Sequence, residues 1–135
     1  ASLRESERRQ RIAVEAAGLG VFEWNVTDDI ATWENDRVYE IFGHTRDDGT
    51  LTAAQFFREY IHPDDAAAFR EALERAAWPG GRLKARCRAR RKDERGYRHL
   101  EFGGHFSLDG ASGTLRLVGV VAVAIGASRR YDGPL

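Results

Sequence analysis

The first sixty residues pass from a polar helical pattern to a short hairpin. Residues 2–17 carry Glu–Arg pairs four apart and stop at Gly18 and Gly20, which predicts a polar helix. Residues 21–26 alternate apolar and polar side chains, which is typical of a half-buried strand. Residues 30–34 follow a Thr-Asp-Asp turn and are the expected hairpin partner.

Capping signals predict three helices in the middle of the chain. Asn35 can cap a short helix that runs through Phe42 and ends at Gly43. A Thr-x-x-Gln capping box precedes the second helix, residues 53–60. The third helix begins at Pro63, has one apolar face and ends before a Pro-Gly-Gly sequence.

The last third of the chain changes to a period of two. Residues 83–89 alternate small apolar with basic side chains, and residues 99–108 alternate again, with Gly103-Gly104 as an expected bulge. Residues 114–125 are apolar on both faces, which is typical of a central strand buried on both sides. We therefore expect an α+β fold with one antiparallel sheet and helices on one face.

Composition limits the possible partners. The 135 residues are enough for one domain, and 21 basic residues balance 21 acidic ones. This balance argues against nucleic acid or an acidic membrane surface as the main partner. The longest nearly apolar run, residues 117–127, is too short to span a bilayer, and the polar start predicts no signal peptide. With a single cysteine, Cys87, we expect a cytoplasmic location.

Several short motifs, in this order, resemble the PAS family of sensory domains, of the bacterial signalling type with a C-terminal PAC motif. They are Gly20-Val-Phe-Glu-Trp24, Trp33 followed ten residues later by Gly43, Ile61-His-Pro-Asp-Asp65, Lys92-Asp93 with Gly96-Tyr97-Arg98, and Leu117-Val-Gly-Val-Val121. The resemblance implies a five-stranded antiparallel sheet whose helices enclose a small pocket. It divides the chain into a flanking helix (1–17), a sensory domain (18–128) and a tail (129–135).

The chain departs from the family pattern in two places. The family often ends its last strand with Asp-Ile-Thr, which helps to couple the sheet to a following helix. Here the stretch is Val123-Ala124-Ile125-Gly126, without a carboxylate. Glu94-Arg95 stands where the family commonly has Asp-Gly, which predicts a longer hairpin.

The family layout implies a ligand pocket between the sheet and helix 63–77. Apolar positions that face inward under this layout are its expected lining. They are Phe42, Phe57, Tyr60, Phe69, Leu73, Cys87, Leu100 and Phe102.

The resemblance also bears on cofactors, and none is assigned. Family members that bind haem use a histidine in the long helix, and residues 64–77 contain none. Flavin photosensors of the family need a cysteine in an Asn-Cys-Arg motif on a helix, whereas Cys87 lies in a predicted strand. Its expected role is a small core residue; the alternative is a redox sensor whose pKa the neighbouring arginines lower.

Two polar clusters admit more than one interpretation. The sequence His62-Pro63-Asp64-Asp65 fits helix initiation, with a metal or acid–base site as the alternative. Nine basic residues between Arg82 and Arg98 fit the solvated face of an outer strand. The alternatives are a nucleic-acid stripe and a docking face for an acidic partner or for the acidic residues of the first helix. No histidine pair has metal-ligand spacing, and no catalytic motif is visible.

The favoured function is a sensory module that binds a small ligand or a partner and regulates an attached domain, such as a histidine kinase or a cyclic-dinucleotide enzyme. The alternatives are a small cone-shaped isomerase or dehydratase with an Asp–His dyad, and a PAS domain that only dimerises. Because the last strand needs cover on its outer face, we expect a homodimer in which residues 2–17 pack on or beside that face.

Overall fold

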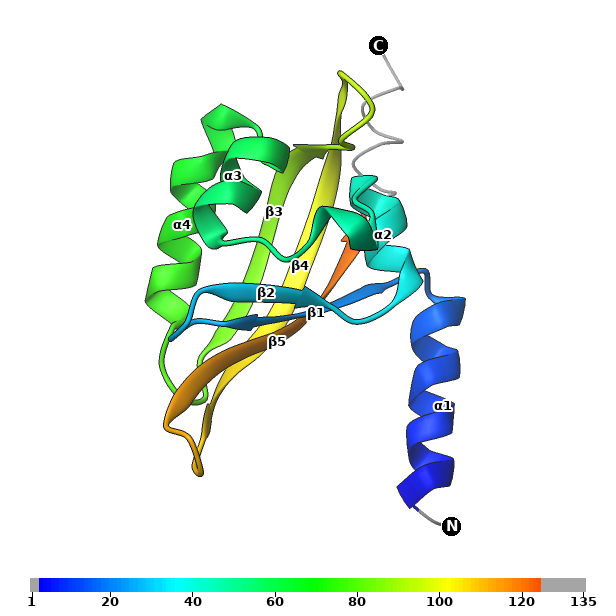
Figure 1. Ribbon diagram of the computed structural model, residues 1–135, viewed down its shortest axis with the longest axis vertical. Coiled ribbons are helices and arrows are strands. Elements are labelled where there is room, and N and C mark those ends of the chain that lie inside the picture. Colours follow the sequence, from blue (N-terminus) through cyan, green and yellow to red (C-terminus); the bar gives the residue numbers. More distant parts are fainter. Residues whose placement is uncertain (1–2, 125–135) are drawn as a thin grey trace.

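One antiparallel sheet organises the computed structural model, which describes residues 3–124 (Figure 1). The strand order is β2-β1-β5-β4-β3, so the strand that comes last in the sequence lies at the centre. The elements are α1 (Leu3–Ala16), β1 (Gly20–Asn25), β2 (Ile30–Trp33), α2 (Asp36–Phe42), a 3-10 turn (Arg46–Asp48), α3 (Ala53–Tyr60), α4 (Pro63–Ala76), β3 (Arg82–Arg90), β4 (Tyr97–Asp109) and β5 (Thr114–Val123). The predicted α+β fold, its five-stranded sheet and its N-terminal helix are confirmed.

The predicted caps form in the structure. The Asn35 side chain accepts a hydrogen bond from the backbone of Val38 at the start of α2, and Gly43 ends this helix at a φ of 65°. Thr52 and Gln55 exchange the two hydrogen bonds of a capping box at α3. These side chains satisfy backbone groups that a helix end leaves unpaired, so the helix boundaries follow from local sequence.

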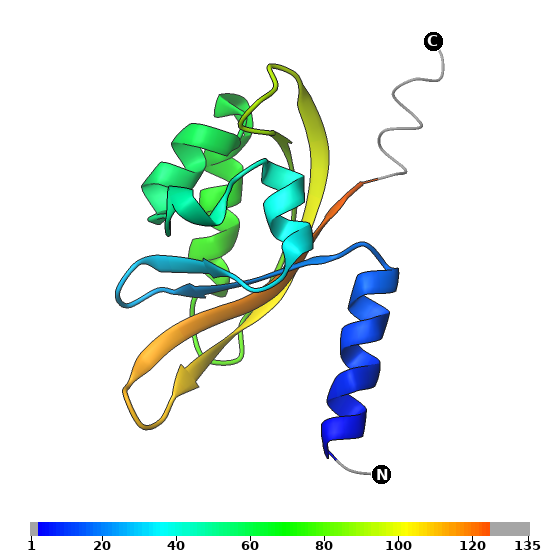
Figure 2. The ribbon, with the colours of Figure 1, turned by 45° about the vertical axis from the view of Figure 1, so that its right-hand side comes forward.

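The sheet has one face covered by helices and one face without them. On the covered face, Leu117 and Val121 of β5 are 2% and 0% exposed. Their neighbour Val118 points to the opposite face and is 37% exposed. The central position of the last strand is confirmed, but the expectation that it is buried on both sides is wrong for the described chain, because no helix crosses its outer face (Figures 1 and 2).

The predicted bulge at Gly103-Gly104 is wrong, because β4 pairs without interruption with both β3 and β5. The glycines serve close packing instead. A Cβ atom on Gly104 would lie 2.6 Å from the carbonyl oxygen of Val118, and one on Gly119 would lie 2.7 Å from Cζ of Phe22. Glycine at these facing positions lets the Phe22 ring lie directly against the sheet.

Helix α1 extends away from the sheet (Figure 2). None of its residues is buried, and Leu3 and Ile12 are 77% and 55% exposed. Within residues 3–124, no helix is both long and apolar enough to cross a membrane. Three predictions concern residues outside the described part of the chain. They are the end of the last strand at Ile125, the departure from the family pattern at residues 125–126, and the tail at 129–135.

Candidate ligand cavity

An apolar cavity of about 70 Å³ lies between the covered face of the sheet, the β1–β2 hairpin and the helices. Strands supply one wall and helices α2, α3 and α4 supply the other. Most of the lining side chains are aromatic. The lining consists of Phe22, Trp24, Ala31, Trp33, Val38, Phe42, Thr52, Ala53, Phe56, Phe57, Phe69, Leu73, Leu83, Phe102 and Leu117.

Most of the residues predicted for the pocket line this cavity. They are Phe42, Phe57, Phe69, Leu73 and Phe102. Three others, Tyr60, Cys87 and Leu100, are buried but do not line it. The structure thus places some of the eight residues beside the cavity, and ligand binding by any of them stays a prediction.

Tyr60 misses the cavity because its polar end has a partner elsewhere. Its hydroxyl lies 2.7 Å from Nδ1 of the buried His44, whose Nε2 lies 2.8 Å from the carbonyl oxygen of Gly49. That carbonyl can only accept, so His44 Nε2 carries the proton and the Tyr60 hydroxyl donates to Nδ1. Burial raises the pKa of Tyr60, so the hydroxyl stays protonated and keeps this role.

Cys87 and Leu100 lie opposite each other on β3 and β4, beyond the end of the cavity. The adjacent bridge between Ile61 and Ala89 closes this part of the core. Burial raises the pKa of the Cys87 thiol to about 12. The alternative of a redox sensor with a lowered pKa is therefore wrong, because the neighbouring arginines point to the other face of the strand.

Several lining residues were not predicted as site residues. Phe22 and Trp24 come from β1, Trp33 from β2 and Leu117 from β5. The alternation in residues 21–26 already places Phe22 and Trp24 on one face. That signal identifies them as inward-facing, but only the pairing of β1 with β5 places them beside the helices.

Hydrogen bonds join the β1–β2 hairpin to the start of α3 beside the cavity. Ala31 donates its backbone N–H to the carbonyl oxygen of Leu51 at 3.0 Å. Asp29 has a positive φ of 57°, and its Oδ1 accepts from Trp24 Nε1 at 3.0 Å and from the backbone N–H of Ala53 at 2.9 Å. One carboxylate oxygen thus joins two lining residues from opposite walls.

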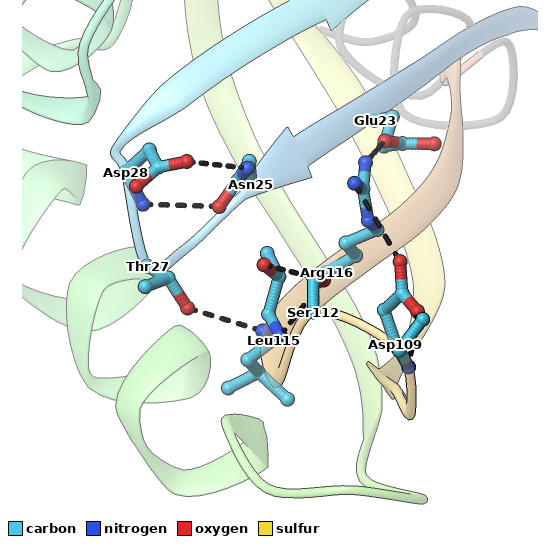
Figure 3. Close-up of polar contacts among 10 residues, drawn as sticks. Glu23, Asn25, Thr27, Asp28, Asp109, Ser112, Leu115 and Arg116 are labelled. Atoms are coloured by element: carbon cyan, nitrogen blue, oxygen red, sulfur yellow. Dashed lines mark hydrogen bonds and ion pairs between the residues drawn. The ribbon is translucent and has the colours of Figure 1, made fainter.

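Polar contacts hold the turn of the β1–β2 hairpin (Figure 3). Asn25 and Asp28 exchange two hydrogen bonds across the turn, at 3.0 and 3.1 Å. The hydroxyl of Thr27 accepts from the backbone N–H of Leu115 at 3.1 Å, which ties the turn to β5. Arg116 pairs with Glu23 on the neighbouring β1 (Figure 3). The hairpin is therefore anchored at its turn, and its other edge faces α3.

Comparison with known proteins identifies the family. The family model for the PAS fold matches residues 31–121. The chain belongs to the PAS family. The PAS resemblance of the sequence is thereby confirmed, and the fold is that of PAS domains rather than that of the cone-shaped enzymes.

Two other comparisons are consistent with this PAS assignment. The "Non-motile and phage-resistance protein" of Caulobacter vibrioides is 34% identical over 86% of this chain, which spans only 14% of that protein. A sensory box histidine kinase/response regulator from Burkholderia thailandensis aligns with a TM-score of 0.72 at 23% identity, covering 92% of this chain and 90% of that one.

A third comparison is with a sensor domain from a different class of signalling enzyme. The N-terminal domain of a diguanylate cyclase with a PAS/PAC sensor, from Marinobacter aquaeolei, aligns with a TM-score of 0.65 at 14% identity, covering 78% of this chain and 94% of that one. At these identities the solved structures establish the shared fold, and the fold does not determine the ligand or the output.

Several of the nine basic residues between Arg82 and Arg98, here called the basic stripe, bond to the helices. Arg88 binds the carboxylate of Asp65 with its side chain and its backbone N–H. Arg91 and Arg98 donate to carbonyl oxygens in the last turn of α2. These three arginines are therefore only partly solvated: Arg88 joins β3 to α4, Arg98 joins β4 to α2, and Arg91 joins the loop after β3 to α2.

The motif His62-Pro63-Asp64-Asp65 initiates α4, as predicted. His62 Nδ1 accepts from the backbone N–H of Asp64 at 3.1 Å, and Pro63 occupies the first turn. Among residues 3–124, no three side chains of His, Cys, Asp or Glu form a group that could hold a metal ion.

Proposed function

We propose that this PAS domain is a sensory module that responds to occupancy of its cavity and regulates an attached output domain. The names of two structural relatives support this proposal, since one is a histidine kinase/response regulator and the other a diguanylate cyclase sensor. The small share of the Caulobacter relative that the chain spans is also typical of a module within a longer protein. Output enzymes of these kinds use nucleotides, so we place the domain in the cytoplasm.

The observation that carries the proposal is the position of α2 between the cavity and α1. Val38 of α2 lines the cavity. From the same helix, Arg37 Nε donates to the carbonyl oxygen of Gly18 at 3.0 Å. Its cap Asn35 donates to the carbonyl oxygen of Leu19 at 3.0 Å. A ligand that displaces α2 therefore also displaces the junction between α1 and β1, which is a physical route for a signal to leave the domain.

Hydrogen exchange of the full chain tests this route. Leu73→Trp fills the cavity and serves as a mimic of the occupied state. We expect it to change amide exchange at the α1–β1 junction, and we expect the added change Arg37→Ala to suppress that response. Arg58→Ala, on the exposed side of α3, is the matched control for Arg37→Ala, and it should leave the response to Leu73→Trp unchanged. Exchange changes confined to the cavity walls contradict the proposal and favour a PAS domain that only dimerises.

We also propose that the domain works as a homodimer through α1 and the outer face of the sheet. Leu3 and Ile12 of α1 and Val118 of β5 are exposed in the single chain, and α1 does not cover the sheet of its own chain. A second copy supplies matching apolar surface of this kind. Sedimentation of the full chain and of a chain lacking residues 1–17 tests this. If both are monomers at high micromolar concentration, the homodimer is wrong.

A further inference from the structure

The walls of the cavity consist almost entirely of carbon. Its lining is formed by aromatic and aliphatic side chains, and Thr52 contributes the one aliphatic hydroxyl group. An apolar cavity of about 150 Å³ in another protein stays dry and binds benzene or xenon. At about 70 Å³, the cavity described here has roughly half that volume.

Three polar groups at or near the cavity have partners within the protein. The hydroxyl of Thr52 accepts from the backbone N–H of Gln55 at 3.2 Å. Trp24 donates its indole N–H to Asp29, and the Tyr60 hydroxyl is bound to His44. A polar ligand would therefore lose its hydrogen bonds to water and replace few of them, which lowers affinity by about tenfold or more.

We propose that the cavity is a binding site for a small, neutral, nonpolar molecule, of the class of gases and short hydrocarbons. The class follows from volume and wall chemistry together: the volume excludes a haem or a flavin ring system, and the walls disfavour organic acids and alcohols. This assignment rests on the proposed sensory function and names the chemistry of its signal.

Hydrogen bonds between the hairpin and α3 limit access to the cavity from this side. The lining residues Ala31, Thr52 and Ala53 on this side are partly exposed, as are Trp24 and Leu73, whereas Val38 and Leu117 are buried. The bond from Ala31 to Leu51 and the bond from Ala53 to Asp29 hold the hairpin against the start of α3. A ligand enters when these contacts separate briefly, and a compact one needs the smallest separation.

Xenon is the first probe, because it is nonpolar and smaller than benzene. We expect saturable changes in the methyl NMR signals of Leu117 under xenon pressure, with none at Val118, its neighbour on the outer face. Leu73→Trp should abolish the changes, and Glu71→Trp, on the exposed face of α4, should leave them intact. If Leu73→Trp fails to fold, Ala53→Leu fills the cavity from the α3 side.

A matched pair of aromatic probes tests the exclusion of polar ligands. Leu73→Ala enlarges the cavity toward the size that holds benzene. We expect benzene to bind this variant about tenfold or more tightly than pyridine, which has the same shape and one ring nitrogen. Equal affinity for benzene and pyridine overturns the proposed ligand class. Xenon-induced signal changes that are equal at Leu117 and Val118, or that do not saturate with xenon pressure, also overturn it.

The two proposals fail in different ways. Xenon binding at Leu117 without any change in exchange at α1 supports the nonpolar ligand class and contradicts the signalling route. Conversely, if Leu73→Trp changes exchange at α1 but neither xenon nor benzene binds, the route is supported and the ligand class is wrong.

Discussion

Asp65→Asn tests the contact that joins the start of α4 to β3. Oδ2 of Asp65 accepts from the backbone N–H of Arg88 at 2.7 Å and from its Nε at 3.0 Å, while Oδ1 accepts from Nη2 at 2.9 Å. The guanidinium is thus bound by both carboxylate oxygens, the geometry in which such pairs are strongest. Asparagine has nearly the same shape but removes the charge and one of the acceptors.

The expected loss follows from the pKa of this carboxyl. Hydrogen bonds from Arg88 lower the pKa of Asp65 from 3.8 to about 2. A difference of this size corresponds to about 2 to 3 kcal/mol of folding free energy. The Arg88 side chain is 37% exposed, so solvent screens the pair, and we expect Asp65→Asn to lower the free energy of unfolding by roughly 1 to 2 kcal/mol at pH 7.

The sign of the pH dependence is fixed by the direction of the pKa change. Because the folded-state pKa is the lower one, the stabilisation is complete well above pH 4 and is lost as the pH falls toward 2. The wild-type protein should therefore approach the variant in acid, with about half of the difference gone by pH 3. Urea unfolding at several pH values measures this directly.

Asp64→Asn is the matched control, since Asp64 also lies in the first turn of α4 but is exposed. Both aspartates interact with the helix dipole, so the difference between the two variants isolates the contact with Arg88. We expect the control to change the free energy of unfolding by less than about 0.5 kcal/mol. Equal losses in the two variants, or a loss in Asp65→Asn that is the same at pH 3 and pH 7, refute the reasoning.

Four further predictions concern the cavity and the core. Asp29→Gly, which suits the positive φ, should speed amide exchange at the start of α3 and cost about 1 kcal/mol in urea unfolding. Asp28→Gly should leave that exchange unchanged, and faster exchange in Asp28→Gly than in Asp29→Gly contradicts the role of Asp29 in holding the hairpin against α3. The Cys87 thiol should resist iodoacetamide at pH 8 until the protein unfolds, since burial raises its pKa to about 12; rapid labelling of native protein is the contrary result. Gly119→Ala should lower the free energy of unfolding by about 1 to 3 kcal/mol, because its Cβ would lie 2.7 Å from a phenylalanine ring. Gly110→Ala is the control, because a Cβ atom at Gly110 would have no other atom within 4 Å, and it should leave the free energy of unfolding nearly unchanged. Similar losses of unfolding free energy in Gly119→Ala and Gly110→Ala rule out the packing argument. The purified protein should show no visible absorption band of a haem or a flavin, because neither fits the cavity, and a stoichiometric band disproves this.

Features that depend on neighbouring residues could be predicted from the sequence. The cap at Asn35, the capping box at Thr52 and the stop at Gly43 each satisfy backbone groups within four residues, so the pattern alone determines them. The inward face of β3 was equally predictable, because alternate side chains along a strand point to opposite faces. The bulge was not, since the role of Gly104 depends on Leu117 and Val118 of another strand.

The cavity lining could be predicted only in part, because its walls come from elements that are distant in sequence. Leu73 and Phe102 follow from the apolar faces of α4 and β4. The position of Tyr60 depends on a histidine sixteen residues earlier, which draws the hydroxyl away from the cavity. An apolar pattern identifies which residues are buried, but the boundary between filled core and cavity depends on how closely their rings approach one another.

The arginines of the basic stripe show the same limit for charged residues. Alternation correctly places Arg88 on the face opposite Cys87, and on that basis the side chain was expected to be solvated. Its partner, Asp65, lies 23 residues earlier and is indistinguishable from Asp64 in the sequence, because both fit the first turn of a helix. Only the docking of α4 against β3 brings one of the two carboxylates to the arginine. The comparison of Asp65→Asn with Asp64→Asn therefore measures tertiary information that a single sequence does not display.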